Sequence, residues 1–439
     1  MAELDSLEQR LEEGTCLVGV IGLGYVGLPL ALAFAEKDIR VLGFDVDSRK
    51  ISALSEKQTY IDYVAAERIA EVVESGLLAA TDDFGRLAEP DALLICVPTP
   101  LTAHQAPDLS YVLDTAERIR KTLRPGQLVI LESTTYPGTT DVELRAVLEK
   151  SGLRCGEDFL LAFSPEREDP GNPDFGTTTI PKVVGGVDER SGRVAAKLYG
   201  KIVPKPIEVS SSRVAEATKL TENIFRAVNI ALVNELKVLF DSMDIDVREV
   251  LDAAATKPFG FMRFDPGPGW GGHCIPVDPY YLSWKAREYG HSARFIELAG
   301  TVNVEMPRWV MSKLQRALND RGRPIQGSRI LVLGLAYKPN VSDPRESPAF
   351  ELLSLLHELG ADYSYHDPFI PVAPAMRSWP ELPSLESKLL TADILSAQDA
   401  VLLVTDHAAV DYDLVLEHAP LIVDTRGVYR QAHAKVIKA

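Results

Sequence analysis

Residues 265–278 have the composition of a loop that could carry a covalent catalytic group. The stretch reads D-P-G-P-G-W-G-G-H-C-I-P-V-D, and its glycines and prolines exclude a regular helix or strand. A backbone with so few side chains lets a ligand approach closely. Cys274 and Asp278 follow the glycines, and a thiol near a carboxylate is a possible nucleophilic pair. Free cysteines are more often buried packing residues. Whether Cys274 is catalytic or structural therefore depends on the other motifs of the chain.

A glycine-rich motif lies near the start of the chain, directly after an apolar run at 16–21. It has the pattern G-x-G-x-x-G and is followed by an alanine- and leucine-rich helical stretch at 28–36. Its residues are Gly22, Gly24, Tyr25, Val26 and Gly27. Between a buried strand and a helix, such glycines let the backbone turn tightly and let a pyrophosphate reach the helix N-terminus. This context favours a dinucleotide site over a simple strand–helix turn.

An acidic residue follows the next predicted strand. The run 40–44 is apolar and ends at Asp45, about 20 residues after the glycines, where a carboxylate binds the ribose hydroxyls of adenosine. The same carboxylate repels a 2′-phosphate, so we expect NAD rather than NADP. Arg49 is the one nearby residue that could instead serve a 2′-phosphate.

Two further predicted strands end in hydroxyl residues. The run 91–97 leads to Thr99, and the run 127–131 leads through E-S-T-T to Thr134. Ligands of doubly wound sheets lie beyond the carboxyl ends of the strands, so both threonines are candidate contacts for the cofactor or a water. Turn and cap hydroxyls are an equally reasonable interpretation.

A dense charge run follows the predicted strand 159–163. It reads S-P-E-R-E-D-P-G-N and contains Glu166 and Arg167, and taken alone it is more typical of a solvated loop. The run 182–186 is interpreted as the last strand of this domain, and 204–206 as its exit.

A long helix is expected from about residue 211 to 242, where glycine and proline are absent. Lys219, Asn223 and Arg226 fall on one face of it, although polar residues on a helix are usually only its solvated side. A helix of around thirty residues is about 45 Å long and could join two domains and carry a dimer interface. Shorter helices are expected at 246–255, 276–288 and 293–304, the first of these before the glycine loop and the others after it.

A second α/β pattern occupies the C-terminal part of the chain. Strands are expected at 329–333, 363–366, 400–404 and 421–423, with a helix at 349–359. The first strand leads into G-L-A-Y, which lacks the glycines of the first loop, so any ligand is held differently. Lys338, Arg345 and Arg426 are cations near strand ends that could meet phosphates.

These patterns predict an α/β protein with two Rossmann-like doubly wound domains, joined by a central helical domain with a long helix. The expected domains are 1–205, 206–318 and 319–439. The length of 439 residues agrees with about three domains, and 46% hydrophobic and 25% charged residues are ordinary for a globular protein.

Charge and cysteine content narrow the function classes. A formal net charge of -17 and a pI near 5.0 disfavour nucleic acid as a partner. The four cysteines are widely spaced and include no C-x-x-C pair, so neither a disulfide framework nor a metal site is expected. With no signal peptide and no apolar run long enough for a membrane span, a cytoplasmic protein is expected.

Seven motifs, in this order, resemble the UDP-glucose/GDP-mannose dehydrogenase family over nearly the whole chain. They are V-I-G-L-G-Y-V-G-L-P-L, I-C-V-P-T-P, E-S-T-T-Y-P-G-T-T, S-P-E-R-E-D-P-G-N, K-L-T-E-N-I-F-R-A-V-N-I-A-L-V-N-E-L, G-P-G-W-G-G-H-C-I-P-V-D-P-Y-Y-L and G-L-A-Y-K-P-N-V-S-D-P-R-E-S-P. Within the family, the fourth and sixth are most similar to UDP-N-acetylglucosamine 6-dehydrogenases. The resemblance implies an NAD domain, a central helical domain that forms a homodimer, and a C-terminal UDP-binding domain.

The implied chemistry is oxidation of a sugar CH₂OH to a carboxylate with reduction of two NAD. A thiolate is needed because the aldehyde must become a thiohemiacetal, and then a thioester, before water releases the acid. By matching motif positions, Cys274 is the nucleophile, and Lys219 and Asn223 stabilise the alkoxide and oxyanion. Asp278 manages protons and water, and Glu166 is the candidate base for thioester hydrolysis. Thr134 positions a water.

The resemblance also implies substrate and cofactor contacts. Arg263 would lie near the diphosphate with Phe261 beside it, and Lys338 and Arg426 would reach the UDP. Arg345 would contact NAD. The remaining implied substrate contacts are Glu166, Arg167, Lys219, Asn223 and Gly271. His273 is interpreted as shaping the substrate site or as structural, rather than as a base.

Several alternatives stay open from the sequence. The same chemistry could act on UDP-glucose, UDP-N-acetylgalactosamine or UDP-N-acetylmannosamine, and the acid product would suit polysaccharide biosynthesis. A two-electron hydroxy-acid dehydrogenase would need no thiol. A non-catalytic nucleotide-sugar or NAD sensor is disfavoured by the intact set of Cys274, Lys219, Asn223 and Asp278.

Overall fold

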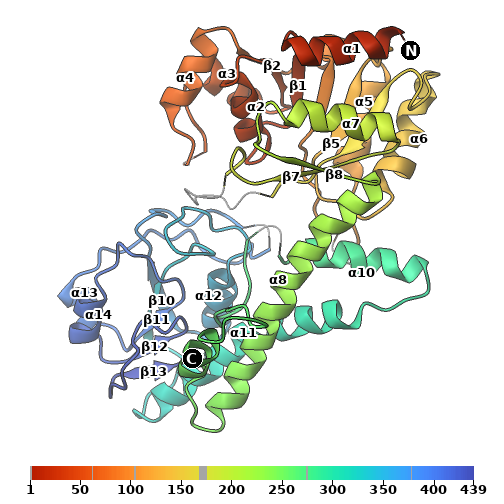
Figure 1. Cartoon of the computed structure of the whole chain (residues 1–439). Helices are drawn as coiled ribbons and strands as arrows, with labels where there is room; N and C mark the ends of the chain where they lie inside the picture. Colours follow the sequence, from red (N-terminus) through yellow and green to blue (C-terminus); the bar gives the residue numbers. More distant parts are fainter. Residues whose placement is uncertain (1, 62, 103–104, 168–175, 273–274, 377) are drawn as a thin grey trace. The chain divides into compact units, whose positions relative to one another are not determined.

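The computed structural model describes residues 2–61, 63–102, 105–167, 176–272, 275–376 and 378–439. The chain divides into two compact units (Figure 1). The first comprises Met1–Glu222 and Tyr280–Ser292, and the second Asn223–Pro279 and Ala293–Ala439. Two helices, α8 (Ser212–Asp241) and α10 (Asp278–Glu288), contain residues of both units.

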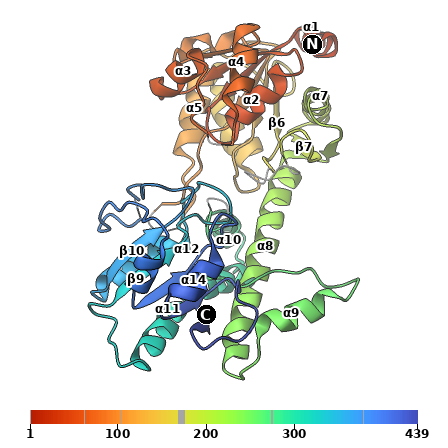
Figure 2. The same ribbon diagram turned by 90° about the vertical axis from the view of Figure 1, so that its left-hand side faces the viewer.

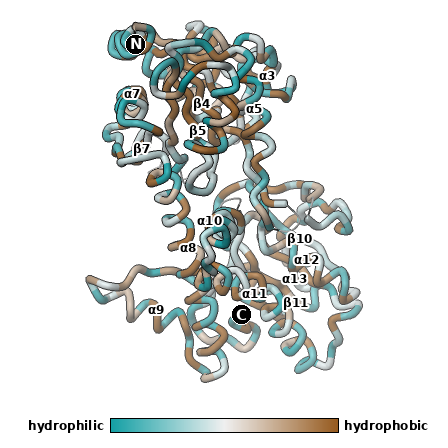
Figure 3. The backbone as a smooth tube through the Cα atoms, turned by 90° about the vertical axis from the view of Figure 1, so that its right-hand side faces the viewer, coloured by the Kyte–Doolittle hydropathy of each residue, from teal (hydrophilic) through white to brown (hydrophobic). Residues whose placement is uncertain are grey.

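The first unit is built on an eight-stranded sheet of order β3-β2-β1-β4-β5-β6-β7-β8. Neighbouring strands are parallel except β6 and β7, which are antiparallel. Every residue of β4, β5 and β6 is buried, as expected for strands covered on both faces, and β4 and β5 are brown in the hydropathy colouring of Figure 3. The strands are β1 (Leu17–Ile21), β2 (Arg40–Phe44), β3 (Leu78–Thr81), β4 (Ala92–Ile95), β5 (Leu128–Leu131), β6 (Leu160–Phe163), β7 (Lys182–Gly186) and β8 (Pro206–Val209).

The interpretation of β7 as the last strand of the first sheet is wrong. The strand β8 pairs with β7 in parallel, so the sheet continues past residue 205. The sequence does not predict β8 or the other edge strand, β3, because neither has a continuous buried apolar run. Proline at the first position of β8 is compatible with an edge, where one side of the strand needs no ladder partner.

Helices surround this sheet. The helix α2 is wholly buried because all nine of its residues are apolar or glycine. The amphipathic helix α1 packs on α7, and Arg190 on α7 pairs with Glu8 on α1 at 3.0 Å. The helices are α1 (Ala2–Glu13), α2 (Gly27–Ala35), α3 (Ser48–Ser55), α4 (Ala66–Glu74), α5 (Ser110–Arg120), α6 (Arg145–Leu148) and α7 (Glu189–Tyr199).

The second unit contains a five-stranded parallel sheet of order β10-β9-β11-β12-β13, in which β9 and β10 run side by side (Figure 2). Its strands are β9 (Arg329–Leu333), β10 (Asp362–His366), β11 (Ala400–Leu403), β12 (Ile422–Asp424) and β13 (Val436–Lys438). Its helices are α9 (Val247–Ala255), α11 (Arg294–Asn319), α12 (Pro348–Glu358), α13 (Ala392–Ser396) and α14 (Tyr412–His418).

The helix α11 is much longer than the predicted 293–304. It continues through Pro307, a residue that ordinarily ends a helix. The buried residues Met306, Val310, Leu314 and Leu318 extend its apolar face, and this tertiary burial outweighs the local cost of proline.

With two largely parallel sheets and a helical centre, the predicted α/β fold class is confirmed. The division into domains at 205 and 318 stays a prediction. Over the described residues, every helix is too short or too polar to cross a membrane.

Candidate active site

The glycine-rich loop between β1 and α2 has the shape of a dinucleotide cradle. Gly22 has φ +93, and a Cβ there would lie 2.6 Å from the carbonyl oxygen of Cys96. A Cβ on Gly27 would meet the carbonyl oxygen of Gly22 at 1.8 Å, whereas a Cβ on Gly24 would meet nothing within 4 Å. The outer glycines are therefore required by packing, and the middle one leaves room for a pyrophosphate. The flanking residues Tyr25 and Val26 directly precede α2, and Val26 is its N-cap residue.

Asp45 lies at the end of β2, beside this turn. Its carboxylate accepts the amide of Leu23 at 2.8 Å and the ammonium of Lys50 at 2.8 Å. Arg49, the candidate for a 2′-phosphate, is instead paired with Asp47 at 2.8 Å. The carboxylate thus stands next to the glycine turn, in the position suited to ribose hydroxyls. The ion pair between Lys50 and Asp45 was not predicted from the sequence, because it depends on how the turn after β2 folds.

The ends of β4 and β5 carry the two predicted threonines. Thr99 is buried and Thr134 is half-buried. The hydroxyl of Ser133 donates to the carbonyl of Val97 at 2.6 Å and so ties the two segments together. The hydroxyl of Thr135 is buried and has no partner among the described residues. Buried hydroxyls are normally hydrogen-bonded, so Thr135 joins Thr134 as a candidate contact for a water or the cofactor.

In the first unit, the S-P-E-R turn is fastened to α8. Lys219 is buried, and its ammonium donates to the main-chain carbonyl of Glu166 at 2.6 Å and lies 3.5 Å from its carboxylate. Arg167 pairs with Glu222 at 2.6 Å and donates to the carbonyl of Pro181 at 2.5 Å. The structure therefore brings Lys219, Glu166 and Arg167 together, although the charge run alone resembled a solvated loop.

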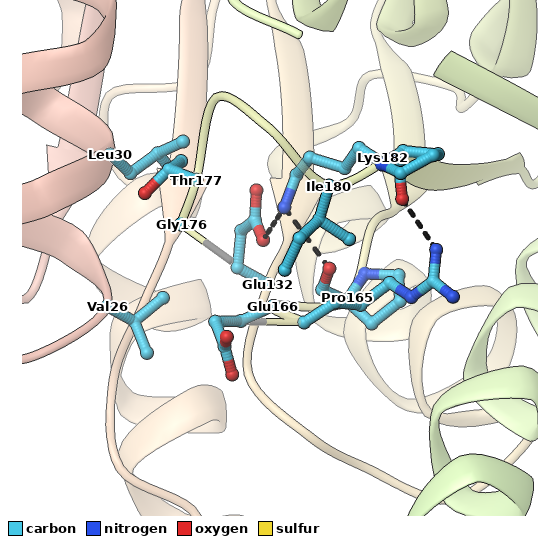
Figure 4. A pocket seen from close by; sticks show the side chains of 11 residues that line it. Val26, Leu30, Glu132, Pro165, Glu166, Gly176, Thr177, Ile180 and Lys182 are labelled. Atoms are coloured by element: carbon cyan, nitrogen blue, oxygen red, sulfur yellow. Dashed lines mark hydrogen bonds and ion pairs between the residues drawn. The ribbon is translucent and has the colours of Figure 1, made fainter. Parts of the chain in front are cut away.

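An open pocket lies beside this turn (Figure 4). It is lined by Val26 and Leu30 from α2, by Glu132 at the end of β5, and by residues of the segments 165–167 and 176–182. The candidate base Glu166 and the cofactor loop therefore border the same space within the first unit.

Asn223 and Asp278 meet in the second unit. The side-chain amide of Asn223 on α8 donates to the carboxylate of Asp278, the first residue of α10, and both side chains are buried. A carboxylate held by an amide in a buried position can accept or release a proton without losing its orientation. Cys274 and His273 lie outside the described residues.

Two buried asparagines anchor the start of the glycine loop. Asn234 on α8 accepts the amide of Gly267 at 2.9 Å and donates to Asn303 on α11 at 2.8 Å. A role for either asparagine was not predicted from the sequence. The one sequence feature that points to them is an amide side chain among the apolar residues of each helix. Further on, the amide of Gly272 donates to the carbonyl of Arg345 at 3.1 Å.

Gly271 must be glycine because the loop packs directly on the G-L-A-Y segment. A Cβ on Gly271 would lie 2.9 Å from the Cβ of Tyr337. The ammonium of Lys338 lies 5.8 Å from the centre of the Tyr337 ring, and both residues are half-buried. Arg345 is half-buried and pairs with Asp343 at 2.6 Å. The structure thus places Gly271, Lys338 and Arg345 in neighbouring segments of the second unit.

Three cations gather after β12, of which Lys237 and Arg248 are buried and Arg426 is half-buried. Arg426 donates to the carbonyl of Val404 at 2.6 Å, Arg248 donates to the carbonyl of Thr425 at 3.0 Å, and Lys237 donates to the same carbonyl at 3.4 Å. Burial lowers the pKa of all three side chains. Carboxylates lie farther off, Asp406 at 4.0 Å from Arg426 and Asp265 at 3.7 Å from Arg248. A cluster of three cations at this point suits an anion. Arg426 was predicted, whereas Lys237 and Arg248 were missed because they come from distant helices.

Arg263 and Phe261 lie on an exposed segment after α9. Arg263 pairs with Asp252 at 2.5 Å and with Asp265 at 2.9 Å, and these hydrogen bonds raise its pKa. Phe261 is exposed. A diphosphate would have to compete with two carboxylates for Arg263.

The carboxylate of Asp367, directly after β10, is hydrogen-bonded to other residues of the second unit. Asp367 is buried and accepts the amide of Leu335 at 2.7 Å and the Nε2 proton of His407 at 3.1 Å. The proton is assigned to Nε2 because Nδ1 of His407 accepts the amide of Asn340 at 3.0 Å. Asp45 holds the corresponding amide in the first unit but has no such partner histidine. The second sheet therefore has no free strand-end carboxylate for a ribose at this position.

Metal ligation finds no support in the described part of the chain, where no group of three or more His, Cys, Asp or Glu residues could hold an ion.

Three family models match consecutive parts of the chain. The NAD binding domain of the UDP-glucose/GDP-mannose dehydrogenase family matches residues 16–203, its central domain 213–305, and its UDP binding domain 331–431. Protein CapL from Staphylococcus aureus is 41% identical over 356 residues, which cover 80% of this chain and 81% of that protein. The chain belongs to the UDP-glucose/GDP-mannose dehydrogenase family.

Other relatives agree with this assignment. The dehydrogenase is 39% identical over 364 residues to a UDP-N-acetyl-D-glucosamine 6-dehydrogenase from Pseudomonas aeruginosa, covering 82% of this chain and 85% of that one. It is similar to the solved structure of a UDP-D-ManNAc dehydrogenase from Pyrococcus horikoshii, with a TM-score of 0.86, 32% sequence identity, and coverage of 96% and 98%. The predicted family is confirmed.

The cofactor of this dehydrogenase is NAD. The matched NAD binding domain includes the glycine loop and Asp45, and the open position at Gly24 fits a pyrophosphate. The prediction of NAD is therefore confirmed.

Proposed function

We propose that this dehydrogenase oxidises the C6 hydroxymethyl group of a UDP-sugar to the carboxylate, with UDP-N-acetylglucosamine as the preferred substrate. The observation that carries the proposal is the pocket beside the cofactor loop, where Val26 and Glu166 line the same space and the ammonium of Lys219 is held at the Glu166 turn. A site with a cofactor loop, a buried cation and a carboxylate suits alcohol oxidation followed by acyl hydrolysis.

NAD, when bound, supplies the two-electron acceptor for each of two oxidations. In the first, the sugar alcohol becomes an aldehyde, and Lys219 and Asn223 donate hydrogen bonds to the developing alkoxide. The thiolate of Cys274 then adds to the aldehyde carbon, and Asp278 manages the protons. The resulting thiohemiacetal is oxidised to a thioester.

Hydrolysis completes the reaction. Glu166 accepts a proton from a water held by Thr134, the water oxygen bonds to the thioester carbon, and the C–S bond breaks. The products are the uronic acid and the free Cys274 thiol, so the enzyme returns to its starting state.

The choice of sugar rests on the motifs and on the relatives. The S-P-E-R-E-D-P-G-N and G-G-H-C motifs favour UDP-N-acetylglucosamine, as does the Pseudomonas aeruginosa relative, which is named for that sugar. A second candidate is UDP-N-acetylmannosamine, because the Pyrococcus horikoshii structure has a high TM-score over 96% of this chain and is named for that sugar. The two sugars differ in the configuration of one carbon, which pocket shape rather than residue type discriminates.

The cations after β12 are proposed to hold the diphosphate of UDP. Arg426 and Arg248 each have a planar guanidinium that can bind phosphate oxygens in pairs, and Arg426 is the better placed because its side chain is the more exposed of the two. Lys338 and Arg263 are further candidates, and Arg263 would exchange Asp252 and Asp265 for the substrate.

A homodimer through the central helices is also proposed. Phe225, Leu232 and Leu239 recur every seven residues along α8 and are 50%, 52% and 47% exposed. A stripe of large exposed apolar side chains at this spacing is typical of a helix–helix interface.

The deciding experiment counts the NADH formed per nucleotide sugar consumed, over a panel of UDP-sugars and GDP-mannose, with NAD and then with NADP. Two NADH with UDP-N-acetylglucosamine preferred would support the whole proposal. Two NADH with another sugar would keep the mechanism and overturn the substrate. One NADH would exclude the thioester route, and no turnover would favour a non-catalytic sensor.

A further inference from the structure

A buried ion pair lies beside the turn that carries Glu166, and the proposed reaction does not use it. Lys182, the first residue of β7, is 7% exposed, and its ammonium lies 2.8 Å from the carboxylate of Glu132. Glu132, at the end of β5, is 1% exposed and accepts the hydroxyl proton of Tyr199 with its other oxygen. The ammonium also lies 4.9 Å from the centre of the Tyr199 ring. Every charge of this cluster is therefore paired.

The same ammonium reaches the turn itself. Lys182 donates to the main-chain carbonyl of Pro165, the residue before Glu166, at 3.2 Å (Figure 4). Two other hydrogen bonds tie the turn to the same segment, from the hydroxyl of Ser164 to the carbonyl of Val183 at 2.8 Å and from Arg167 to the carbonyl of Pro181 at 2.5 Å. The turn is therefore held on both sides of Glu166.

Figure 4 shows the consequence for the candidate base. The carboxylate of Glu166 points away from Lys182, on the side of the turn where Val26 lies. Lys182 binds the main chain of the turn and pairs with Glu132, whereas the cation near the Glu166 carboxylate is Lys219, at 3.5 Å. Lys182 can therefore orient the base through the main chain.

We propose that Lys182, paired with Glu132, is a positioning residue that orients Glu166 for hydrolysis of the acyl-enzyme. The buried pair acts as a unit. Without Glu132, the Lys182 ammonium would be a buried charge without its ion-pair partner. Without Lys182, the same would hold for the Glu132 carboxylate. Tyr199 completes the hydrogen bonding of the carboxylate. This inference rests on the proposed role of Glu166 as the hydrolytic base.

The test uses the full-length enzyme with the double substitution Lys182→Met and Glu132→Leu. Replacing both partners of a buried ion pair by apolar residues of similar size is often tolerated by the fold, whereas removing one is not. If this variant does not fold, Lys182→Gln with Glu132→Gln takes its place. Tyr199→Phe is the matched control because it removes a hydroxyl from the cluster and keeps the bond from Lys182 to Pro165.

The double variant should hydrolyse the acyl-enzyme slowly. We expect kcat to fall about tenfold to a hundredfold, which is part of what a general base contributes. The rapid burst of two NADH per active site should remain, and the acyl adduct should accumulate and be visible by intact-protein mass spectrometry. Lys182→Arg, which keeps a cationic donor, should restore most of the turnover, and Tyr199→Phe should stay close to wild type.

Three kinetic results would overturn the inference: a folded double variant with wild-type kcat, a loss of the burst, or a Lys182→Arg variant as slow as the double variant. Hydrogen–deuterium exchange of the amides of Ser164, Glu166 and Arg167 separates this inference from the proposed function, since faster exchange in the double variant is expected whatever sugar is oxidised. If wild-type enzyme forms one NADH per sugar, the proposed function fails, and the exchange result still shows whether Lys182 holds the turn. Unchanged exchange would reject the positioning role by itself.

Discussion

The ammonium of Lys219 on α8 donates a hydrogen bond to the main-chain carbonyl of Glu166 at 2.6 Å, although the two residues are 53 positions apart in the sequence. The contact fastens the S-P-E-R turn to the helix and leaves a cation next to the Glu166 carboxylate. The residue proposed to stabilise the alkoxide is thus also part of the support for the proposed base.

The first prediction concerns this lysine. Lys219→Met should lower kcat about a hundredfold or more, because one donor to the developing alkoxide is lost. Steady-state kinetics with UDP-N-acetylglucosamine would measure it, and Lys205→Met, at an exposed position of the first unit, serves as the control. A variant within twofold of wild type would show that Lys219 only supports the turn.

The second prediction concerns the thiol. Cys274→Ala should form no uronic acid, because the aldehyde can no longer become a thioester, and should still bind NAD. Product analysis and NAD titration would measure both properties. Acid formation at the wild-type rate would reject the covalent route.

The third prediction concerns cofactor choice. Asp45→Ser should raise the KM for NAD at least about tenfold and weaken the preference for NAD over NADP, since a hydrogen bond to a charged group contributes about 1.5–3 kcal/mol. The neighbouring Asp47→Ser, which removes a carboxylate paired with Arg49, is the control and should change the KM for NAD little. Asp45→Ser also loses the hydrogen bond from the amide of Leu23. Thermal melts of both variants would check that a less stable fold is not the cause of the higher KM. An unchanged NAD preference would place the ribose elsewhere.

The fourth prediction concerns pH and stability. Glu216 on α8 is buried and accepts hydrogen bonds from the amide of Gly138 at 2.7 Å and the amide of Thr140 at 2.9 Å. Burial nevertheless raises the pKa of Glu216 from its ordinary 4.5 to about 7. Because the folded state binds this proton more tightly than the unfolded state, the stabilisation is present at low pH and is lost as the pH rises from about 4.5 to 7.

Glu216→Gln cannot titrate at this position. Across this pH window, the free energy of unfolding of wild type should therefore fall more than that of the variant, and the difference should be on the order of 3 kcal/mol. Urea unfolding at pH 5 and pH 7.5 would measure the difference. Glu235→Gln, at an exposed position of the same helix, should leave the pH dependence as in wild type. If the free energy of unfolding changed equally with pH in wild type and Glu216→Gln, the raised pKa of Glu216 would be wrong.

The fifth prediction concerns self-association. Leu232→Glu places a charge in the exposed stripe of α8 and should weaken the proposed dimer at least about tenfold, because a carboxylate is costly to bury. Sedimentation of the variant over a range of concentrations would measure it. Leu389→Glu makes the same change at a site that is 78% exposed and should leave the association unchanged. A Leu232→Glu variant that still dimerises like wild type would place the interface on another surface.

Local patterns allowed much of the fold to be predicted. The strand β2 was predicted residue for residue, and α8 within about one residue at each end, because apolar runs and helical periodicity are properties of neighbouring residues. The edge strands β3, β8 and β13 were missed because short, partly exposed strands carry little such pattern.

The sequence by itself determined the family, the cofactor and the residue types of the site, since motif spacing survives in the linear chain. Only the tertiary structure decided which partners the buried charges take. Lys182 meets Glu132 across 50 positions, and Arg248 meets Thr425 across 177. The physical reason is that a buried charge must be paired or hydrogen-bonded, and the packing of distant elements, rather than sequence spacing, selects its partner.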